Sequence, residues 1–293
     1  MKANRIALAG VAAVLLGAGC KADPGPFFAV HGPLAYVRYV AAVPDTFATD
    51  WRPIDGIENS PPAIGLVFRG TTPYQAMTPG PRHIRLFPAP TGVARPANVV
   101  SQIIVDTTIT FTASTYYTVV HLGFSRTGST PQDRLVVLED VAPANLSGKV
   151  ALRVVHAGTG IGAVDVFATT TSTAAVAGPA IFTNVQYGTK TDYTLVDPAT
   201  LAATTPPTAN FWLRVAATGT STPELIAGTS RQAPPGQEGN PTSLLTPIGG
   251  AAMAGSAMTA FILPRSVAGS LAPQTTAFQT PVLLYLIDKH PPQ

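Results

Sequence analysis

Two stretches of the chain repeat one pattern of apolar and polar positions. The clearer stretch, Ala151–Phe167, is an apolar run, a turn-rich loop and a second apolar run, and Tyr36–Trp51 is its fainter copy. Each copy carries an Arg in its first run and an Asp twelve positions later. These residues are Arg38 and Asp50 in the first copy, and Arg153 and Asp165 in the second. The echo predicts a duplicated domain.

Short runs rich in Thr, Val and Tyr, separated by Pro and Gly turns, predict an all-β protein. After Leu34–Ala42 and Ala48–Trp51, the strands expected in the first repeat are Ile64–Arg69, His83–Phe87, Val99–Thr112, Tyr116–Gly123 and Arg134–Val141. Seven short strands in one repeat are typical of an immunoglobulin-like β-sandwich. Side chains alternate along a strand, so only one of Tyr116 and Tyr117 can point into the core.

The later landmarks of the two repeats follow the same order. They are Tyr74 and Tyr193, each five residues before a Pro; Arg85 and Arg214; and the runs Leu135–Asp140 and Leu283–Asp288. We therefore predict two tandem sandwiches, residues 34–143 and 150–290, joined by a linker at 144–149. The second repeat is longer because of Ala199–Asn210 and the low-complexity run Arg231–Gly255, within which Pro234–Asn240 is predicted to be disordered.

The N-terminus has the pattern of an export signal. Residues 1–19 place Lys2 and Arg5 before an apolar run and end in small residues, and that run is too short to span a bilayer. Cys20 is the single cysteine of the chain and follows directly. This arrangement resembles a bacterial lipobox, although Gly17 stands where that pattern prefers Leu. The resemblance implies a lipid-anchored Cys20, a tether over residues 20–33 and, from Lys21 at the next position, the outer membrane.

The charge of the mature chain argues against nucleic acid as a partner. Removal of residues 1–19 takes away two basic residues and no acid, so the formal net charge falls from +3 to +1. Charged residues make up 11% of the chain, against about 25% in an average domain, and they form no basic stripe.

A hairpin centred near Pro44 in the first copy and near Thr159 in the second would set the two charged residues of each copy face to face. The expected cross-strand ion pairs are Arg38–Asp50 and Arg153–Asp165.

Other candidate residues carry weaker signals. The glycine loop after His156 fits a dinucleotide fingerprint only in spacing, because strand-like sequence follows where a helix is required. His156 lies at a strand end beside this loop and is either a ligand-binding or a structural histidine. The aromatic candidates for ligand binding are Trp51, Tyr116, Tyr117 and Trp212, each of which is alternatively a core residue. No metal-ligand spacing, cofactor motif or nucleophile elbow is present, so we expect no cofactor and no enzyme.

The run LRVVHA, a short loop and then AVDVF resemble the opening of domain-of-unknown-function family 4397. The first copy, VRYVAAVPDTFATDW, is similar but has Ala41 where the second has His156. The resemblance implies β-sandwich modules of exported bacterial proteins, commonly repeated, and supplies no activity and no catalytic residues.

Two functions remain open at this point. One is a non-catalytic envelope module that binds a glycan, a peptide or a neighbouring envelope protein through loops or exposed aromatics. The other is a structural spacer; a hydrolase is a weaker alternative.

Overall fold

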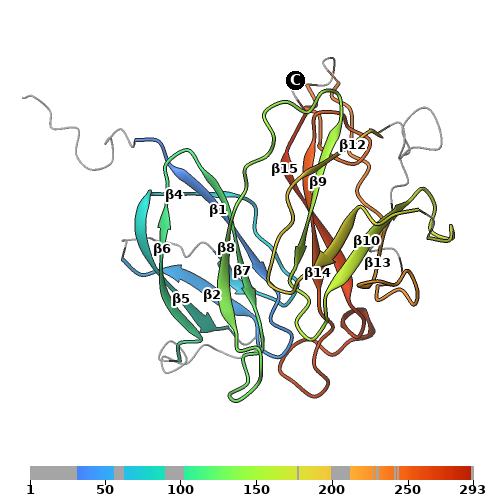
Figure 1. Ribbon diagram of the computed structural model, residues 1–293. Coiled ribbons are helices and arrows are strands. Elements are labelled where there is room, and N and C mark those ends of the chain that lie inside the picture. Colours follow the sequence, from blue (N-terminus) through green and yellow to red (C-terminus); the bar gives the residue numbers. More distant parts are fainter. Residues whose placement is uncertain are drawn as a thin grey trace, which may run out of the picture. The chain divides into compact units, whose positions relative to one another are not determined.

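The computed structural model describes residues 32–55, 63–89, 102–176, 178–198, 212–226, 228, 231–240, 242 and 244–291. Residues Leu34–Gln293 form one compact unit. The expected signal segment, Cys20 and the insertion Ala199–Asn210 lie outside the described residues, as does nearly all of the tether. The predicted all-β fold is confirmed, since the strands fall into four sheets of three or four strands (Figure 1).

The first sandwich is built from β1 (Ala35–Ala41), β2 (Thr49–Pro53), β3 (Ala63–Leu66), β4 (Gln75–Met77), β5 (Gly80–Pro88), β6 (Val105–Phe111), β7 (Tyr116–Leu122) and β8 (Arg134–Glu139). Its two sheets have the strand orders β4-β1-β7-β8 and β3-β2-β5-β6. Strands β1 and β7 are parallel neighbours, and their register places Arg38 beside Thr118.

The second sandwich repeats this plan with β9 (Val150–His156), β10 (Val164–Thr169), β11 (Phe182–Val185), β12 (Thr194–Val196), β13 (Trp212–Ala217), β14 (Ala257–Leu263) and β15 (Val282–Lys289). A short 3-10 helix, η4 (Thr276–Phe278), precedes β15. The sheet orders are β12-β9-β14-β15 and β11-β10-β13. Strands β9 and β14 are again parallel neighbours, with Arg153 beside Thr259. The two sandwiches therefore share the register of their central parallel strands and the same strand order, except that the described residues of the second sandwich contain no equivalent of β6.

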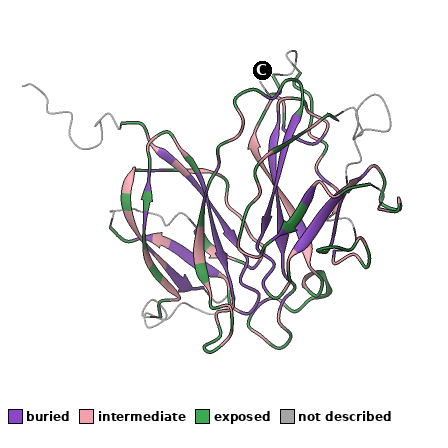
Figure 2. Cartoon of the chain, viewed as in Figure 1, coloured by how far each residue is buried: buried purple, intermediate pink, exposed green. Residues whose placement is uncertain are grey.

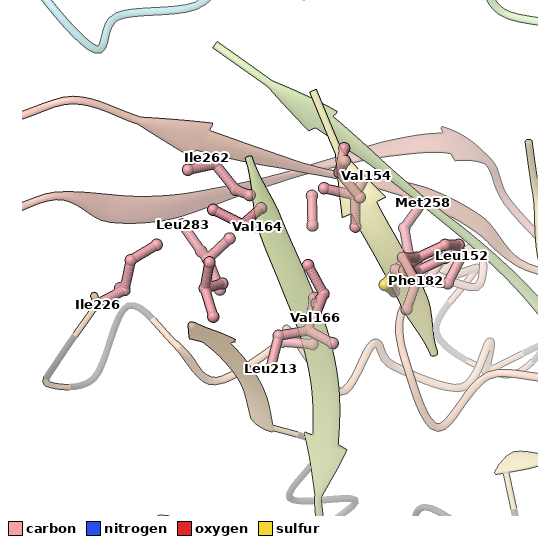
Figure 3. Packing of buried hydrophobic residues seen from close by; sticks show 14 of the residues in the cluster. Leu152, Val154, Val164, Val166, Phe182, Leu213, Ile226, Met258, Ile262 and Leu283 are labelled. Carbon is pink, nitrogen blue, oxygen red and sulfur yellow. The ribbon is translucent and has the colours of Figure 1, made fainter. Parts of the chain in front are cut away.

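Each sandwich has its own apolar core, made by side chains that point between its two sheets. In the second sandwich, Leu152 and Val154 of β9 face Val164 and Val166 of β10 (Figure 3). The equivalent core of the first sandwich includes Val37, Tyr39, Trp51, Ile84 and Phe111. Burial is therefore concentrated on the central strands (Figure 2).

A third apolar cluster joins the two sandwiches. It brings together Val40 and Val120 from the first and Val155 and Phe261 from the second, all at most 2% exposed. These residues lie on the strand faces opposite to the two cores, because side chains alternate along a strand. We call this contact between the sheets β4-β1-β7-β8 and β12-β9-β14-β15 the seam. It explains why β1 and β9 are apolar on both faces.

Two expectations from the sequence are wrong. Strands β1 and β2 form no hairpin: β1 pairs with β4 and β7, whereas β2 pairs with β3 and β5 in the opposite sheet. The predicted disorder of Pro234–Asn240 is also wrong, because Gln237 and Ile248 exchange two backbone hydrogen bonds and Asn240 and Leu245 do the same. Periodicity identified the strands, but not the sheet to which each belongs.

Candidate functional site

Arg38 links the two sandwiches at the seam. Its Nε donates to Thr118 Oγ1 at 2.7 Å within its own sheet, while Nη2 is paired with Asp288 of the second sandwich. Nη1 donates to the carbonyl oxygen of Ile287 at 3.2 Å. The guanidinium lies 4.5 Å from the centre of the Tyr74 ring. A cation from one sandwich is thus satisfied by a carboxylate of the other.

Arg153 makes the reciprocal connection. Its Nε donates to Thr259 Oγ1 at 2.7 Å, its Nη2 is paired with Asp140 of the first sandwich, and its Nη1 donates to the Glu139 carbonyl at 3.3 Å. The guanidinium lies 4.7 Å from the centre of the Tyr193 ring. The two sandwiches therefore exchange equivalent ion pairs.

Each carboxylate is further held by its own sandwich. Asp140 accepts from Thr118 Oγ1 at 2.6 Å and from Tyr74 Oη at 2.8 Å. Asp288 accepts from Thr259 Oγ1 at 2.6 Å and from Tyr193 Oη at 2.8 Å. We call these eight residues the clasp: Arg38, Tyr74, Thr118, Asp140, Arg153, Tyr193, Thr259 and Asp288.

The clasp is almost completely shielded from water. The side chains of its two short ion pairs are 0–4% exposed. Burial, together with the neighbouring carboxylates, raises the pKa of Tyr74 and of Tyr193, so both phenols stay protonated and donate. Burial alone would lower the pKa of Arg153, but Asp288, Tyr193 and Asp140 raise it overall. Buried charges are tolerated where their polar atoms have hydrogen-bond partners. No buried side-chain nitrogen or oxygen of the clasp lacks a partner, so we interpret the clasp as a structural element.

The expected pairs Arg38–Asp50 and Arg153–Asp165 are therefore wrong. The Asp residues lie in β2 and β10, on the sheets away from the seam. Asp50 pairs with Arg52 at 3.0 Å and accepts from the Gly65 amide at 2.8 Å. Asp165 accepts from the amides of Asn184 and Gly219 at 2.7 and 2.9 Å. Gly65 and Asn184 both have positive φ, so each Asp holds a kink in the neighbouring strand.

A second contact fastens the loop between β14 and β15 to the first sandwich. Arg69 donates to the carbonyl oxygens of Pro264 at 2.7 Å and Ala277 at 2.8 Å. Its guanidinium also lies 5.1 and 5.2 Å from the ring centres of Phe68 and Phe278. Burial lowers the pKa of Arg69 to about 10, which leaves the group charged at neutral pH.

His156 is a structural residue. It is fully buried, its Nε2 lies 2.8 Å from the Gly162 carbonyl, and its Nδ1 accepts from the Gly158 amide at 3.2 Å. Only a neutral imidazole with its proton on Nε2 satisfies both partners. Burial lowers its pKa, in agreement with that geometry. The imidazole holds the glycine loop and has no free nitrogen for a ligand.

Of the aromatic candidates, Trp51 and Tyr117 are core residues. Trp51 is fully buried and donates from Nε1 to Thr49 Oγ1 at 3.0 Å. Tyr117 is 7% exposed, and its hydroxyl accepts from the Thr112 amide at 3.1 Å. Trp212 is half-buried at the start of β13, with the Arg231 guanidinium 5.9 Å from its ring centre. Trp51 and Tyr117 therefore offer no open aromatic face to a ligand.

The alternation predicts that one of Tyr116 and Tyr117 is exposed, and that residue is Tyr116. It is 43% exposed and stacks on Tyr36, with ring centres 4.8 Å apart and planes inclined by 16°. The Tyr74 ring lies nearly perpendicular to the Tyr116 ring, with planes inclined by 83° and ring centres 5.0 Å apart. Beside this cluster lies a groove of about 600 Å³, lined by Tyr74, Ser114, Thr115, Tyr116, Glu139, Asp140, Val141, Ala142, Ile287, Asp288, Lys289 and His290. We call it the aromatic groove.

The second sandwich has no counterpart of this tyrosine stack. The matching registers place Ala151 and Ala257 where the first sandwich has Tyr36 and Tyr116. Leu146 of the linker packs against both alanines and is 5% exposed. The linker thus covers in the second sandwich the position that stays open in the first.

Other kinds of site find little support in the described part of the chain. It contains no group of three or more His, Cys, Asp or Glu side chains that could hold a metal ion. No helix among the same residues has the length and apolar character needed to cross a bilayer.

The comparison with protein families covers the first sandwich and continues into the second. Residues 35–167 match the family model described as Domain of unknown function (DUF4397). This part of the chain is similar to members of that family. The DUF4397 segment ends at the end of the motif AVDVF, so it contains β1 to β9, most of β10, and both arginines of the clasp. Among the curated proteins, none matches the chain.

Proposed function

We propose that the chain is a non-catalytic binding module that takes a neutral glycan in the aromatic groove. The observation that carries this proposal is the exposed Tyr116 ring, held flat against Tyr36 at the edge of the groove. A ring that is fixed by its neighbours offers an apolar face at little cost in conformational entropy. Sugar rings present C–H faces that stack on such a surface.

The polar lining suits a ligand rich in hydroxyl groups. Glu139 is exposed at the groove, and its backbone carbonyl accepts from Arg153 Nη1 and Lys190 Nζ. No side chain among the described residues engages its carboxylate. Binding sites typically combine an aromatic face with a few polar groups that fix orientation. The Asp140 and Asp288 carboxylates are occupied by the clasp, so the exposed Glu139 carboxylate is the acceptor that we assign to the ligand.

The structural spacer remains the second candidate function. The apolar seam and the clasp favour it, because they join the two sandwiches into one unit suited to holding a surface at a fixed position. The two functions are compatible: the clasp supplies rigidity and the aromatic groove supplies recognition.

The cell envelope is the location that the sequence supports. We propose that Cys20 is lipidated after removal of residues 1–19 and anchors the protein in the outer membrane. Cys20→Ser should release the protein from the membrane fraction. Unchanged sedimentation with membranes would contradict the anchor.

Glycan binding is tested by screening the protein on a glycan array and then titrating a bound glycan against variants. Tyr116→Ala should abolish binding, while Tyr116→Phe, which keeps the ring, should retain it. Ile64→Ala is the matched control, because it removes another exposed apolar side chain, 54% exposed, from the opposite sheet. Equal binding by wild type and Tyr116→Ala, or no glycan bound by the wild type, would favour the spacer.

A further inference from the structure

A second groove, of about 680 Å³, lies where the chain leaves the central parallel strands of both sandwiches. Its lining comes from the loops after β1, β7, β9 and β14, together with residues just before β15. The lining residues are Pro44, Phe124, Thr159, Gly160, Ile161, Arg265, Ser266, Val267, Ala268, Gln274, Gln279 and Pro281. We call it the Arg265 groove.

The Arg265 groove contains a cation and no carboxylate. Arg265 is exposed, and no hydrogen bond or ion pair within the described part of the chain engages its side chain. Ser266 is 8% exposed, and its Oγ has no hydrogen-bond partner among the same residues. A buried hydroxyl without a partner is energetically costly and points to a group that the protein itself does not supply. Rotation about the single side-chain torsion χ1 reorients the Ser266 hydroxyl, so it can turn toward a ligand.

The equivalent position in the first sandwich indicates that a carboxylate fits this groove. Asp45 lies seven residues after Arg38, and its carboxylate accepts from the amides of Ser125 and Arg126 at 2.8 and 3.1 Å. The first sandwich therefore carries its own carboxylate between the loops that follow β1 and β7.

The second sandwich lacks that carboxylate. Gly160 lies seven residues after Arg153, where the first sandwich has Asp45, and Ser266 takes the place of Ser125. Arg265 stands where the first sandwich has Phe124. A Cβ added at Gly160 would meet no atom closer than 3.8 Å, so the missing side chain leaves space. The second sandwich therefore lacks the acid of the first and carries an additional cation, Arg265, in the same groove.

We propose that the Arg265 groove binds the carboxylate group of an external ligand, with Arg265 and the Ser266 hydroxyl as donors. A guanidinium pairs with a carboxylate through two parallel hydrogen bonds, which suits this anion. The carboxylate belongs to an acidic sugar or to an acidic peptide, and both sources share this chemistry. The site is separate from the aromatic groove and shares no lining residue with it.

The test follows the amide resonances of Gly160 and Ser266 while the isotope-labelled protein is titrated with glucuronate, N-acetylglutamate, glucose or inorganic phosphate. We expect saturable shifts with glucuronate or N-acetylglutamate and none with glucose. Tighter binding of glucuronate would identify an acidic sugar as the ligand, and tighter binding of N-acetylglutamate an acidic peptide. Arg265→Gln should weaken binding about tenfold or more. Arg126→Gln, which removes another exposed cation nearby, should leave it unchanged.

Two further variants guard against a simple charge effect. Ser266→Ala should weaken binding without changing the net charge. Gly160→Asp restores the internal carboxylate of the first sandwich and should prevent binding, since Asp tolerates the φ of +80° better than most residues. The proposal is overturned if carboxylates produce no saturable shift, if phosphate alone binds, or if Arg126→Gln weakens binding as much as Arg265→Gln. Melting temperatures equal to that of the wild type confirm that these variants are folded.

Discussion

The two sandwiches share the residues of the clasp and differ in the residues that line the grooves. Arg38 and Arg153 occupy equivalent positions and make equivalent bonds, each to an Asp of the other sandwich. Tyr36 and Tyr116, in contrast, are replaced by Ala151 and Ala257 in the second sandwich. The repeated residues hold the two halves together, whereas the unrepeated ones give the two grooves their different linings.

Removing a carboxylate of the clasp should have the largest effect on stability. Asp140→Ala leaves the Arg153 guanidinium buried without its partner and also leaves Thr118 and Tyr74 without their acceptor. We expect a loss of about 3–5 kcal/mol in the free energy of unfolding, measured by chemical denaturation. Asp288→Ala should cost a similar amount because its position is equivalent.

The control for this prediction is Asp106→Ala. Asp106 pairs with Arg85 and His83 at the surface, so its removal should cause a much smaller change. A loss after Asp106→Ala as large as after Asp140→Ala would show that the clasp has no special role. Clearly unequal losses for Asp140→Ala and Asp288→Ala would break the equivalence of the two halves.

Substitution of Leu146 tests whether this linker residue covers Ala151 and Ala257 of the second sandwich. Leu146→Ala removes apolar contacts with Ala151 and Ala257. Since the linker can close over part of the space, a loss of about 2 kcal/mol is expected, at the low end for a buried Leu. Tyr116→Ala, at the equivalent place on the first sandwich, removes only the ring contacts with Tyr36 and Tyr74 and should lower stability by about 1 kcal/mol or less in the same denaturation assay. The reverse order would contradict the covered and open assignments.

His156 should give the smallest effect, visible as a pH dependence. The pKa of this buried imidazole lies below its ordinary value of 6.5 in the folded chain, so the unfolded chain binds the proton more readily. The neutral imidazole therefore contributes stability above about pH 6.5, and this contribution is lost as the pH falls toward the lower folded pKa.

The check compares melting temperatures at about pH 7.5 and about pH 5 for wild type and His156→Gln. Because Gln does not titrate, the decrease between the two pH values should be smaller in the variant. Burial also acts on Asp133, whose pKa is lowered overall by hydrogen bonds from His121 and Gln132, but this group titrates equally in both proteins and cancels. An identical decrease in the two proteins would assign the pH dependence to other groups.

The fold class and most strand positions could be predicted from the sequence, because alternation and turn residues are local signals. The same alternation predicted that only one of Tyr116 and Tyr117 points into the core, and the structure shows that it is Tyr117. The pairing of Arg38 could not be predicted in this way, since Asp288 lies 250 residues away in the other sandwich. A signal was nevertheless present: Tyr74, Asp140 and their repeats are among the landmarks that the two halves have in common. The apolar residues on both faces of β1 and β9 were a second signal that each strand is covered on both sides.

The most direct test of the exchanged ion pairs is a double-mutant cycle on Arg38 and Asp288, with Arg38→Met and Asp288→Asn studied singly and together by chemical denaturation. We expect a coupling energy of about 1.5–3 kcal/mol for this pair. For Arg38 and Asp50, which lie in different sheets, we expect a coupling within about 0.5 kcal/mol of zero. Coupling between Arg38 and Asp50, with none between Arg38 and Asp288, would contradict the exchange of ion pairs between the sandwiches.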